Sequence, residues 1–379
     1  MHTTDYYSDL GIFLYYTPIV SSFAAAFALF VKRQRTNPQL WLAFVFIMLG
    51  IGMTSSFVFD RYLCAIHSEI LRPVNFVCST AISISAFFYY ISLMRPHLLT
   101  KKFIAAFCGG WLLFALFCIL PEVIPTQPHP VRDIHQINIS STLVVFRLLG
   151  NGCLIAFDVC LTIYVVKIYR SYRKFISNVY SFAEGITLSW VSITIIMFVL
   201  MGVLDMIWMI NSSSSFKILF NVISFCIIWT IFFFGFRQGD IPKSEEEEEI
   251  EEIEDDYPIT LEDKQTNLKA KIQEYFIDNK PYLNPELTLK DIAQALDISH
   301  YKLSRFINKE FQVNFYTLIN RFRIEYILKQ IESDKEIVNC DTLYTASGFK
   351  SRTVFFRQFK EATGCTPQEY IDKQKKEKE

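Results

Sequence analysis

Long apolar runs dominate the first 239 residues of the chain. A helix needs about 20 apolar residues to cross a hydrocarbon core of about 30 Å, and seven runs reach that length. Strands of a membrane barrel would be about 10 residues long and alternate in polarity, whereas these runs are longer and continuous. The pattern therefore predicts seven transmembrane helices, near residues 10–31, 40–59, 74–94, 103–124, 142–166, 184–210 and 216–236.

From about residue 263 the pattern changes to short amphipathic helices. The sequence shows no alternation of apolar and polar positions between turn signals, as half-buried strands would require. Helices are expected near 264–279, 289–296, 300–310, 314–331 and 340–346, between Ser351 and Gly364, and from Pro367 onward. The predicted fold class is all-α: a seven-helix transmembrane bundle, a linker and an all-helical soluble domain.

Two parts of the soluble domain have the spacing of a helix-turn-helix. In the first, Thr288 and Asp291 have the spacing of a capping box, and after a break at 297–299, Ser299 can cap the next helix. In the second, a short helix meets Gly348, which permits a positive φ, and Ser351 can cap the helix that follows. Two such units about fifty residues apart could meet successive faces of the major groove.

Charge separates the chain into three segments. Residues 1–239 have a net charge of +7, residues 240–262 of −11 and residues 263–379 of +3. The predicted domains are accordingly a transmembrane domain at 1–239, an acidic linker at 240–262 and a soluble domain at 263–379. Blocks of like charge repel one another and stay solvated. We interpret the linker as a tether; the alternative is a DNA mimic that competes for the basic surface of the following domain.

The basic residues between the apolar runs predict the orientation in the membrane. Twelve Lys and Arg residues follow runs one, three, five and seven, whereas the opposite connectors hold three, or four with Lys217. Cytoplasmic connectors carry the excess of Lys and Arg. The N-terminus is therefore expected outside and the soluble domain inside the cell. The first run is not interpreted as a signal peptide, because no Lys or Arg precedes it.

The fifth run contains polar residues on one helical face. Arg147, Asn151 and Asp158 lie at positions i, i+4 and i+11, and Asp205 lies in the sixth run. Ionisable groups inside a bilayer usually face a bundle interior or a wet cavity. They predict either an intramembrane ligand or ion pocket or, as the alternative, a structural pairing of Arg147 with a carboxylate.

The remaining chemistry-bearing residues do not form a known catalytic or metal pattern. The nine cysteines are scattered without a C-x-x-C pair, and the six histidines lack metal spacing. The sequence has no Gly-rich phosphate loop and no nucleophile motif. We therefore expect no enzyme activity, no metal and no cofactor.

Two stretches in the soluble half support a family resemblance. They are Leu289 to Phe311 (LKDIAQALDISHYKLSRFINKEF) and Gly348 to Tyr370 (GFKSRTVFFRQFKEATGCTPQEY). Through them, residues 264–372 resemble the DNA-binding domain of the AraC/XylS family of bacterial transcription regulators. The apolar half is similar to that of membrane-embedded variants with a polytopic N-terminal region.

The resemblance implies roles for individual residues. Base contacts would come from Tyr301, Ser304 and Arg305 in the first unit and from Arg352, Thr353 and Arg357 in the second. Lys302, Lys309 and Lys360 are better suited to phosphates. Tyr344 departs from the family pattern, because a small Ala usually occupies that position, and this places the angle of the second unit in doubt.

The resulting hypothesis is a membrane-anchored regulator of transcription in the inner membrane of a bacterium. Its expected partners are double-stranded DNA and the lipid bilayer. Further candidates are a small-molecule or membrane-derived signal, RNA polymerase and a second copy of the chain. The alternative function is a polytopic receptor or transporter whose helical tail binds proteins.

Overall fold

The computed structural model describes residues 9–34, 36–58, 73–123, 142–182, 188–210, 214–238, 262–333 and 340–378. Within these residues the chain is all-helical, apart from one isolated bridge, as predicted. The chain divides into two compact units. The N-terminal unit comprises residues Met1–Tyr169 and Leu188–Ile241, and the C-terminal unit comprises Arg170–Thr187 and Pro242–Glu379. The acidic run 245–256 lies outside the described residues.

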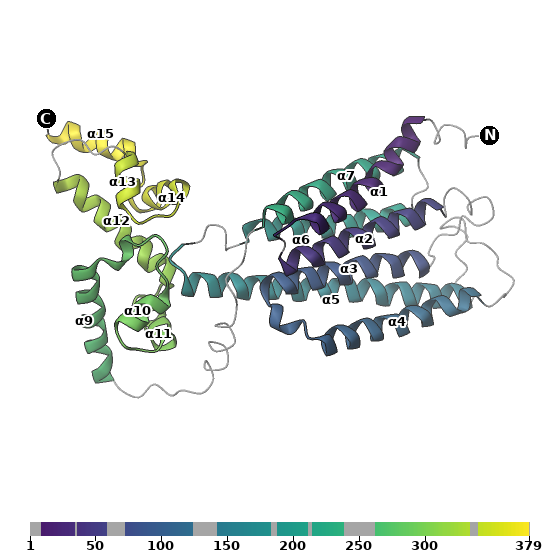
Figure 1. Cartoon of the computed structure of the whole chain (residues 1–379), viewed down its shortest axis with the longest axis horizontal. Coiled ribbons are helices and arrows are strands. Elements are labelled where there is room, and N and C mark those ends of the chain that lie inside the picture. The colour runs from purple at the N-terminus through teal and green to yellow at the C-terminus, as the bar shows by residue number, and fades with distance from the viewer. Residues whose placement is uncertain are drawn as a thin grey trace. The chain divides into compact units, whose positions relative to one another are not determined.

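The N-terminal unit is a bundle of long apolar helices (Figure 1). Its helix α1 packs against α2 and α7, and α2 also packs against α3. Each predicted run lies within or overlaps one of the helices α1 (Asp9–Val31), α2 (Asn37–Val58), α3 (Pro73–Met94), α4 (Lys101–Val123), α5 (Thr142–Val179), α6 (Ser189–Ile210) and α7 (Ser214–Arg237).

Five helical segments of this unit are long and apolar enough to span a membrane. They are Phe13–Val31, Asn37–Ser55, Val77–Met94, Leu148–Val179 and Ile218–Arg237 among the described residues, and Ser189–Leu204 is a shorter apolar segment. Large apolar side chains such as Phe27, Leu113 and Ile196 are more than 60% exposed, as expected for surfaces that face lipid rather than water. These features are consistent with a membrane protein, while the number of seven crossings stays a prediction.

Polar side chains join helices inside this bundle. The indole nitrogen of Trp111 in α4 donates to Oγ1 of Thr80 in α3 (2.9 Å), and the Tyr90 hydroxyl of α3 donates to Oγ1 of Thr194 in α6 (3.0 Å). Nε2 of Gln39, which is fully buried, donates to the carbonyl of Gly235 near the end of α7 (3.0 Å). These bonds satisfy polar groups that lipid could not solvate.

Besides the end of α5, the described residues of the C-terminal unit form a set of shorter helical elements (Figure 1). They are α9 (Glu262–Asn279), the 3-10 turn η5 (Pro281–Leu283), α10 (Leu289–Ala295), α11 (His300–Glu310), α12 (Phe315–Ser333), α13 (Cys340–Ala346), α14 (Arg352–Thr363) and α15 (Pro367–Lys378).

Helix α12 joins two separate hydrophobic cores. Its first half contributes Phe315, Leu318 and Ile319 to a core shared with α9, α10 and α11. Its second half contributes Ile324, Ile327 and Ile331 to a core shared with α13, α14 and α15. One helix therefore carries both helix-turn-helix units, so its sequence must present apolar residues to two sets of partners.

Local signals set most helix ends in this unit. The Thr288 hydroxyl accepts from the Asp291 amide (3.3 Å), and the Asp291 carboxylate accepts from the Thr288 amide (2.8 Å), which confirms the capping box. The Ser299 hydroxyl accepts from the Lys302 amide (3.2 Å), and Gly364 ends α14 with φ of 81°. One prediction is wrong: Ser351 is the N-cap residue of α14, but its hydroxyl makes no capping bond.

Candidate nucleic-acid interface

The first candidate recognition helix, called a reading head below, is α11, the second helix of the first helix-turn-helix. Leu303, Phe306 and Ile307 face the core, and the Ser299 cap fixes where the helix begins. The backbone at Asp297 takes a positive φ of 52° in the turn between α10 and α11. The burial of one face leaves the other face of α11 for a ligand.

Four of the five predicted DNA contacts on α11 are accessible. Lys302 and Lys309 are exposed, and Tyr301 and Arg305 are half-buried. Ser304 does not suit the base contact that the resemblance implied, because its side chain is only 8% exposed. Ser304 is adjacent to Leu303 and one turn before Ile307, so it shares their side of the helix.

The second candidate reading head is helix α14. Phe355 and Phe359 are fully buried, and their rings pack edge-to-face with centroids 5.9 Å apart. The predicted contact residues of this helix lie on the opposite, exposed side: Arg352, Thr353, Arg357 and Lys360. Within one helix, the apolar face thus anchors the reading head and the polar face carries three cations.

Two arginines of α14 have partners within the protein. Arg352 forms an ion pair with Asp341 at the start of α13 (Nη1 to Oδ1, 2.9 Å), and both side chains are about 60% exposed. Nη2 of Arg357 donates to the hydroxyl of Tyr316 in α12 (3.4 Å). An exposed ion pair is worth only about 0–1 kcal/mol, so DNA can compete for Arg352 at small cost.

The turn before α14 depends on Gly348. Its φ is 74°, and a Cβ placed there would lie 2.5 Å from the carbonyl oxygen of Tyr282 and 2.7 Å from Cα of Leu283. Only glycine satisfies both the left-handed backbone and the close approach of the η5 turn. The second helix-turn-helix is thus fitted directly against the turn that precedes the first.

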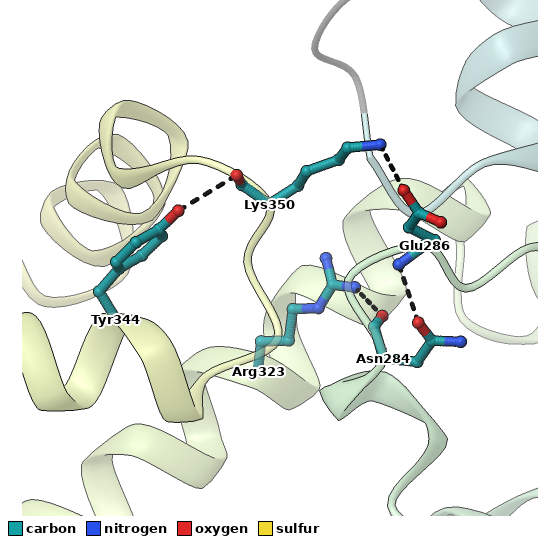
Figure 2. A network of polar contacts seen from close by, with 5 residues as sticks. All are labelled: Asn284, Glu286, Arg323, Tyr344 and Lys350. Carbon is teal, nitrogen blue, oxygen red and sulfur yellow. Dashed lines mark hydrogen bonds and ion pairs between the residues drawn. The ribbon is translucent and has the colours of Figure 1, made fainter.

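Tyr344 is accommodated at the position where a small residue was expected. Its hydroxyl donates to the carbonyl of Lys350 (3.1 Å; Figure 2). Its ring also packs on Phe355, with centroids 6.2 Å apart. The larger side chain therefore ties α13 to the turn that leads into α14. Its hydrogen bond fixes the entry to the second reading head.

Sequence reasoning missed the most buried charged residue among the described residues of the C-terminal unit. Arg323 of α12 is 1% exposed, and burial lowers the pKa of its guanidinium to about 10. Its Nε donates to the carbonyl of Tyr282 (2.7 Å) and its Nη2 to the carbonyl of Asn284 (2.8 Å; Figure 2). The only sequence signal was an Arg on the apolar side of an amphipathic helix.

The predicted intramembrane site is described in part. Asn151 is buried, whereas Asp158 lines a cavity of about 330 Å³ together with Ser79, Ser83 and Tyr90 of α3. The side chains of Arg147 and Asp205 lie outside the described residues, so the predicted grouping of the four residues stays a prediction. Among the described residues, no cluster of His, Cys, Asp or Glu has the geometry to hold a metal ion.

These features define a DNA-binding helix-turn-helix protein. Residues 292–373 match the family model of a helix-turn-helix domain, and this domain is of the AraC type. The C-terminal part of the chain is therefore an AraC-type helix-turn-helix domain, as its resemblance implied. No curated protein matches the chain. No solved structure matches it either.

Proposed function

We propose that this chain is a membrane-anchored, sequence-specific regulator of transcription. The observation that carries the proposal is an AraC-type domain with two exposed basic helices, in the same chain as a bundle of apolar helices. Lys and Arg contacts to phosphates supply affinity, and side chains on the two reading heads supply sequence choice. The apolar bundle anchors the protein in the inner membrane of a bacterium and biases DNA binding in response to a signal.

The direct test is to recover genomic DNA fragments with the purified full-length chain in lipid nanodiscs. A regulator is expected to enrich a small set of fragments that share one sequence pattern. Enrichment of no fragment over bulk DNA would contradict the proposal and favour a receptor or transporter whose tail binds proteins. DNA that is enriched without a shared pattern would contradict sequence-specific reading.

Arg305→Ala is expected to weaken binding to the recovered operator by about 1–3 kcal/mol, because Arg is suited to bidentate contact with guanine. Lys309→Ala is the matched control on the same helix. Its loss should be similar on operator and scrambled DNA and should reduce the salt dependence by roughly one phosphate contact. Titrations on both DNAs at two salt concentrations check this. If Arg305→Ala weakened binding to both DNAs equally, Arg305 would not read a base, and the sequence-specific contacts would be assigned to α14.

Asp158→Asn is expected to change regulated transcription by about fivefold or more if the cavity beside α3 receives the signal. The substitution replaces a carboxyl group on the cavity wall with a neutral amide of nearly the same shape. A reporter gene under the operator measures transcription, and immunoblotting of membranes measures abundance. A fall in abundance that accounts for the whole change would assign Asp158 a structural role instead.

The orientation is tested with a reporter enzyme that is active only outside the cytoplasm. A fusion after Gln238 is expected to be silent, because the excess of basic residues predicts a cytoplasmic location for this end of α7. A fusion that is inserted before α1 should be active. Activity after Gln238 would contradict the predicted seven crossings.

A further inference from the structure

The segment that follows α5 pairs with the first helix-turn-helix inside the C-terminal unit. Tyr180 lies opposite Thr288 in an antiparallel bridge, and the Ser181 amide donates to the carbonyl of Leu287 (3.1 Å). Ser181 is fully buried. Thr288 is the N-cap residue of α10, so this short bridge holds the point where the first helix-turn-helix begins.

Ser181 also completes the coordination of the buried Arg323. The Ser181 carbonyl accepts from Nη1 (3.0 Å), and the Ser181 hydroxyl accepts from Nη2 (3.1 Å). The other acceptors, on Tyr282, Asn284 and Asn320, belong to η5, the loop after it and α12. Bonds from a charged donor are the strong ones, and a buried donor without an acceptor is costly. Ser181 therefore supplies two acceptors to a buried guanidinium that water cannot easily reach.

The same segment reaches the second helix-turn-helix. The guanidinium carbon of Arg323 lies 5.4 Å from the ring centroid of Phe349, in the turn before α14. Nζ of the neighbouring Lys350 lies 4.4 Å from the ring centroid of Phe182 and 2.8 Å from the carboxylate of Glu286. Figure 2 shows Lys350 and Arg323 converging on the loop that holds Asn284 and Glu286. Residues 180–182 thus contact both helix-turn-helix units, where the two lie against each other within the C-terminal unit.

These residues directly continue a helix that is longer than a membrane requires. Helix α5 has 38 residues, which corresponds to about 57 Å at 1.5 Å per residue. Its residues up to Tyr169 belong to the N-terminal unit, and those from Arg170 belong to the C-terminal unit. Among helices α1 to α7, α5 is the one whose described residues contribute to both compact units.

We propose that residues 180–182 are a docking segment that holds the two helix-turn-helix units in a fixed relative position. Through this segment, a displacement of α5 controls DNA binding. The docked segment keeps the guanidinium of Arg323 fully bonded and keeps both reading heads at one spacing. Withdrawal of the segment loosens the junction, so that the two helix-turn-helix units no longer bind both half-sites of an operator at the same time. The control of DNA binding rests on the proposed function, whereas the docking itself does not.

The docking is tested by a disulfide between Tyr180→Cys and Thr288→Cys in the full-length chain, with the native cysteines replaced. The bond from Ser181 to Leu287 makes Tyr180 and Thr288 a non-hydrogen-bonded antiparallel pair, the kind with the closest Cβ atoms. The disulfide is expected to form readily under mild oxidation in nanodiscs. The control pair is Tyr180→Cys with Gln294→Cys. Position 294 lies about 9 Å further along α10 than Thr288, so this pair should not form a disulfide. Absence of the first disulfide overturns the proposal.

The control of DNA binding is tested by Ser181→Pro, which removes both the amide that donates to Leu287 and the hydroxyl that accepts from Arg323, at a position two residues beyond the end of α5. We expect about tenfold weaker binding to an operator with both half-sites and little change on a single half-site. Ser177→Ala, a change on the last turns of α5, should behave like the parent. Unchanged or tighter binding of Ser181→Pro to the full operator overturns the proposed control.

The two readouts separate the two proposals. A parent chain that forms the disulfide but selects no DNA would reject the proposed function and, with it, the control of DNA binding, and would sustain the docking. A parent chain that selects DNA but forms no disulfide would sustain the function and reject the docking segment.

Discussion

Gly348→Ala is expected to abolish operator binding by the second helix-turn-helix. An alanine at φ of 74° is strained, and its Cβ would lie 2.5 Å from the Tyr282 carbonyl oxygen and 2.7 Å from Cα of Leu283. These atoms are backbone and cannot rotate away, so the turn or the η5 segment must shift. The expected loss of stability in the second unit is at least about 2 kcal/mol. Hydrogen exchange of α14 measures the loss of stability, and titration with operator DNA measures the loss of binding.

Gly364→Ala is the matched control for this experiment. Gly364 also has a positive φ, of 81°, but nothing lies within 4 Å of the position of an added Cβ. Its substitution should therefore cost only the conformational preference, about 1 kcal/mol. Equal protection of α14 in both variants would show that the close approach to Tyr282 is not a constraint.

Arg323→Lys is expected to loosen the junction of the two units although it keeps the positive charge. A lysine ammonium cannot reproduce the planar fork that serves carbonyls on Tyr282, Asn284 and Ser181 at once. At least two buried acceptors would lose their donor, for an expected cost of about 3 kcal/mol. Hydrogen exchange of α12 in the full-length chain measures the local stability, and the operator titration measures its consequence.

Arg321→Lys is the control for the loss of the guanidinium group itself. Arg321 lies two residues earlier in α12, and its side chain is exposed. Its replacement should change the free energy of opening of α12, as measured by hydrogen exchange, by less than about 0.5 kcal/mol. If Arg321→Lys and Arg323→Lys loosened α12 to the same extent, the buried network would not be the source of the stability.

The helical architecture and much of the candidate interface could be predicted because they depend on local patterns. The length of the apolar runs placed the helices of the N-terminal unit, since a bilayer sets the length of a spanning segment. The cap at Thr288 and the glycines at 348 and 364 placed helix ends, since each acts within a few residues of itself. The exposure of the basic residues on α14 followed from the apolar positions of Phe355 and Phe359.

Some of the local expectations failed where a neighbouring helix decides the environment of a side chain. The resemblance implied a base contact for Ser304, but the burial of its side chain depends on how α11 packs on the core. Tyr344 replaces the small residue of the family pattern, and only the packed structure shows that its hydroxyl has a partner across the turn, the carbonyl of Lys350. A single-helix pattern specifies which residues share a face and does not specify what covers that face.

By itself the sequence determined that this protein has an apolar helical half and a soluble half with two helix-turn-helix units, because periodicity, caps and turn glycines act over a few residues. The AraC type came from the resemblance of two sequence stretches to that family. Only the tertiary structure decided that Arg323 is buried and that Ser181, 142 residues away, supplies two of its acceptors. A contact over that separation depends on where distant backbone carbonyls come to lie, and no local pattern encodes it. The physical reason is that a buried guanidinium must find all its acceptors at once, and here they come from three separate stretches of the chain.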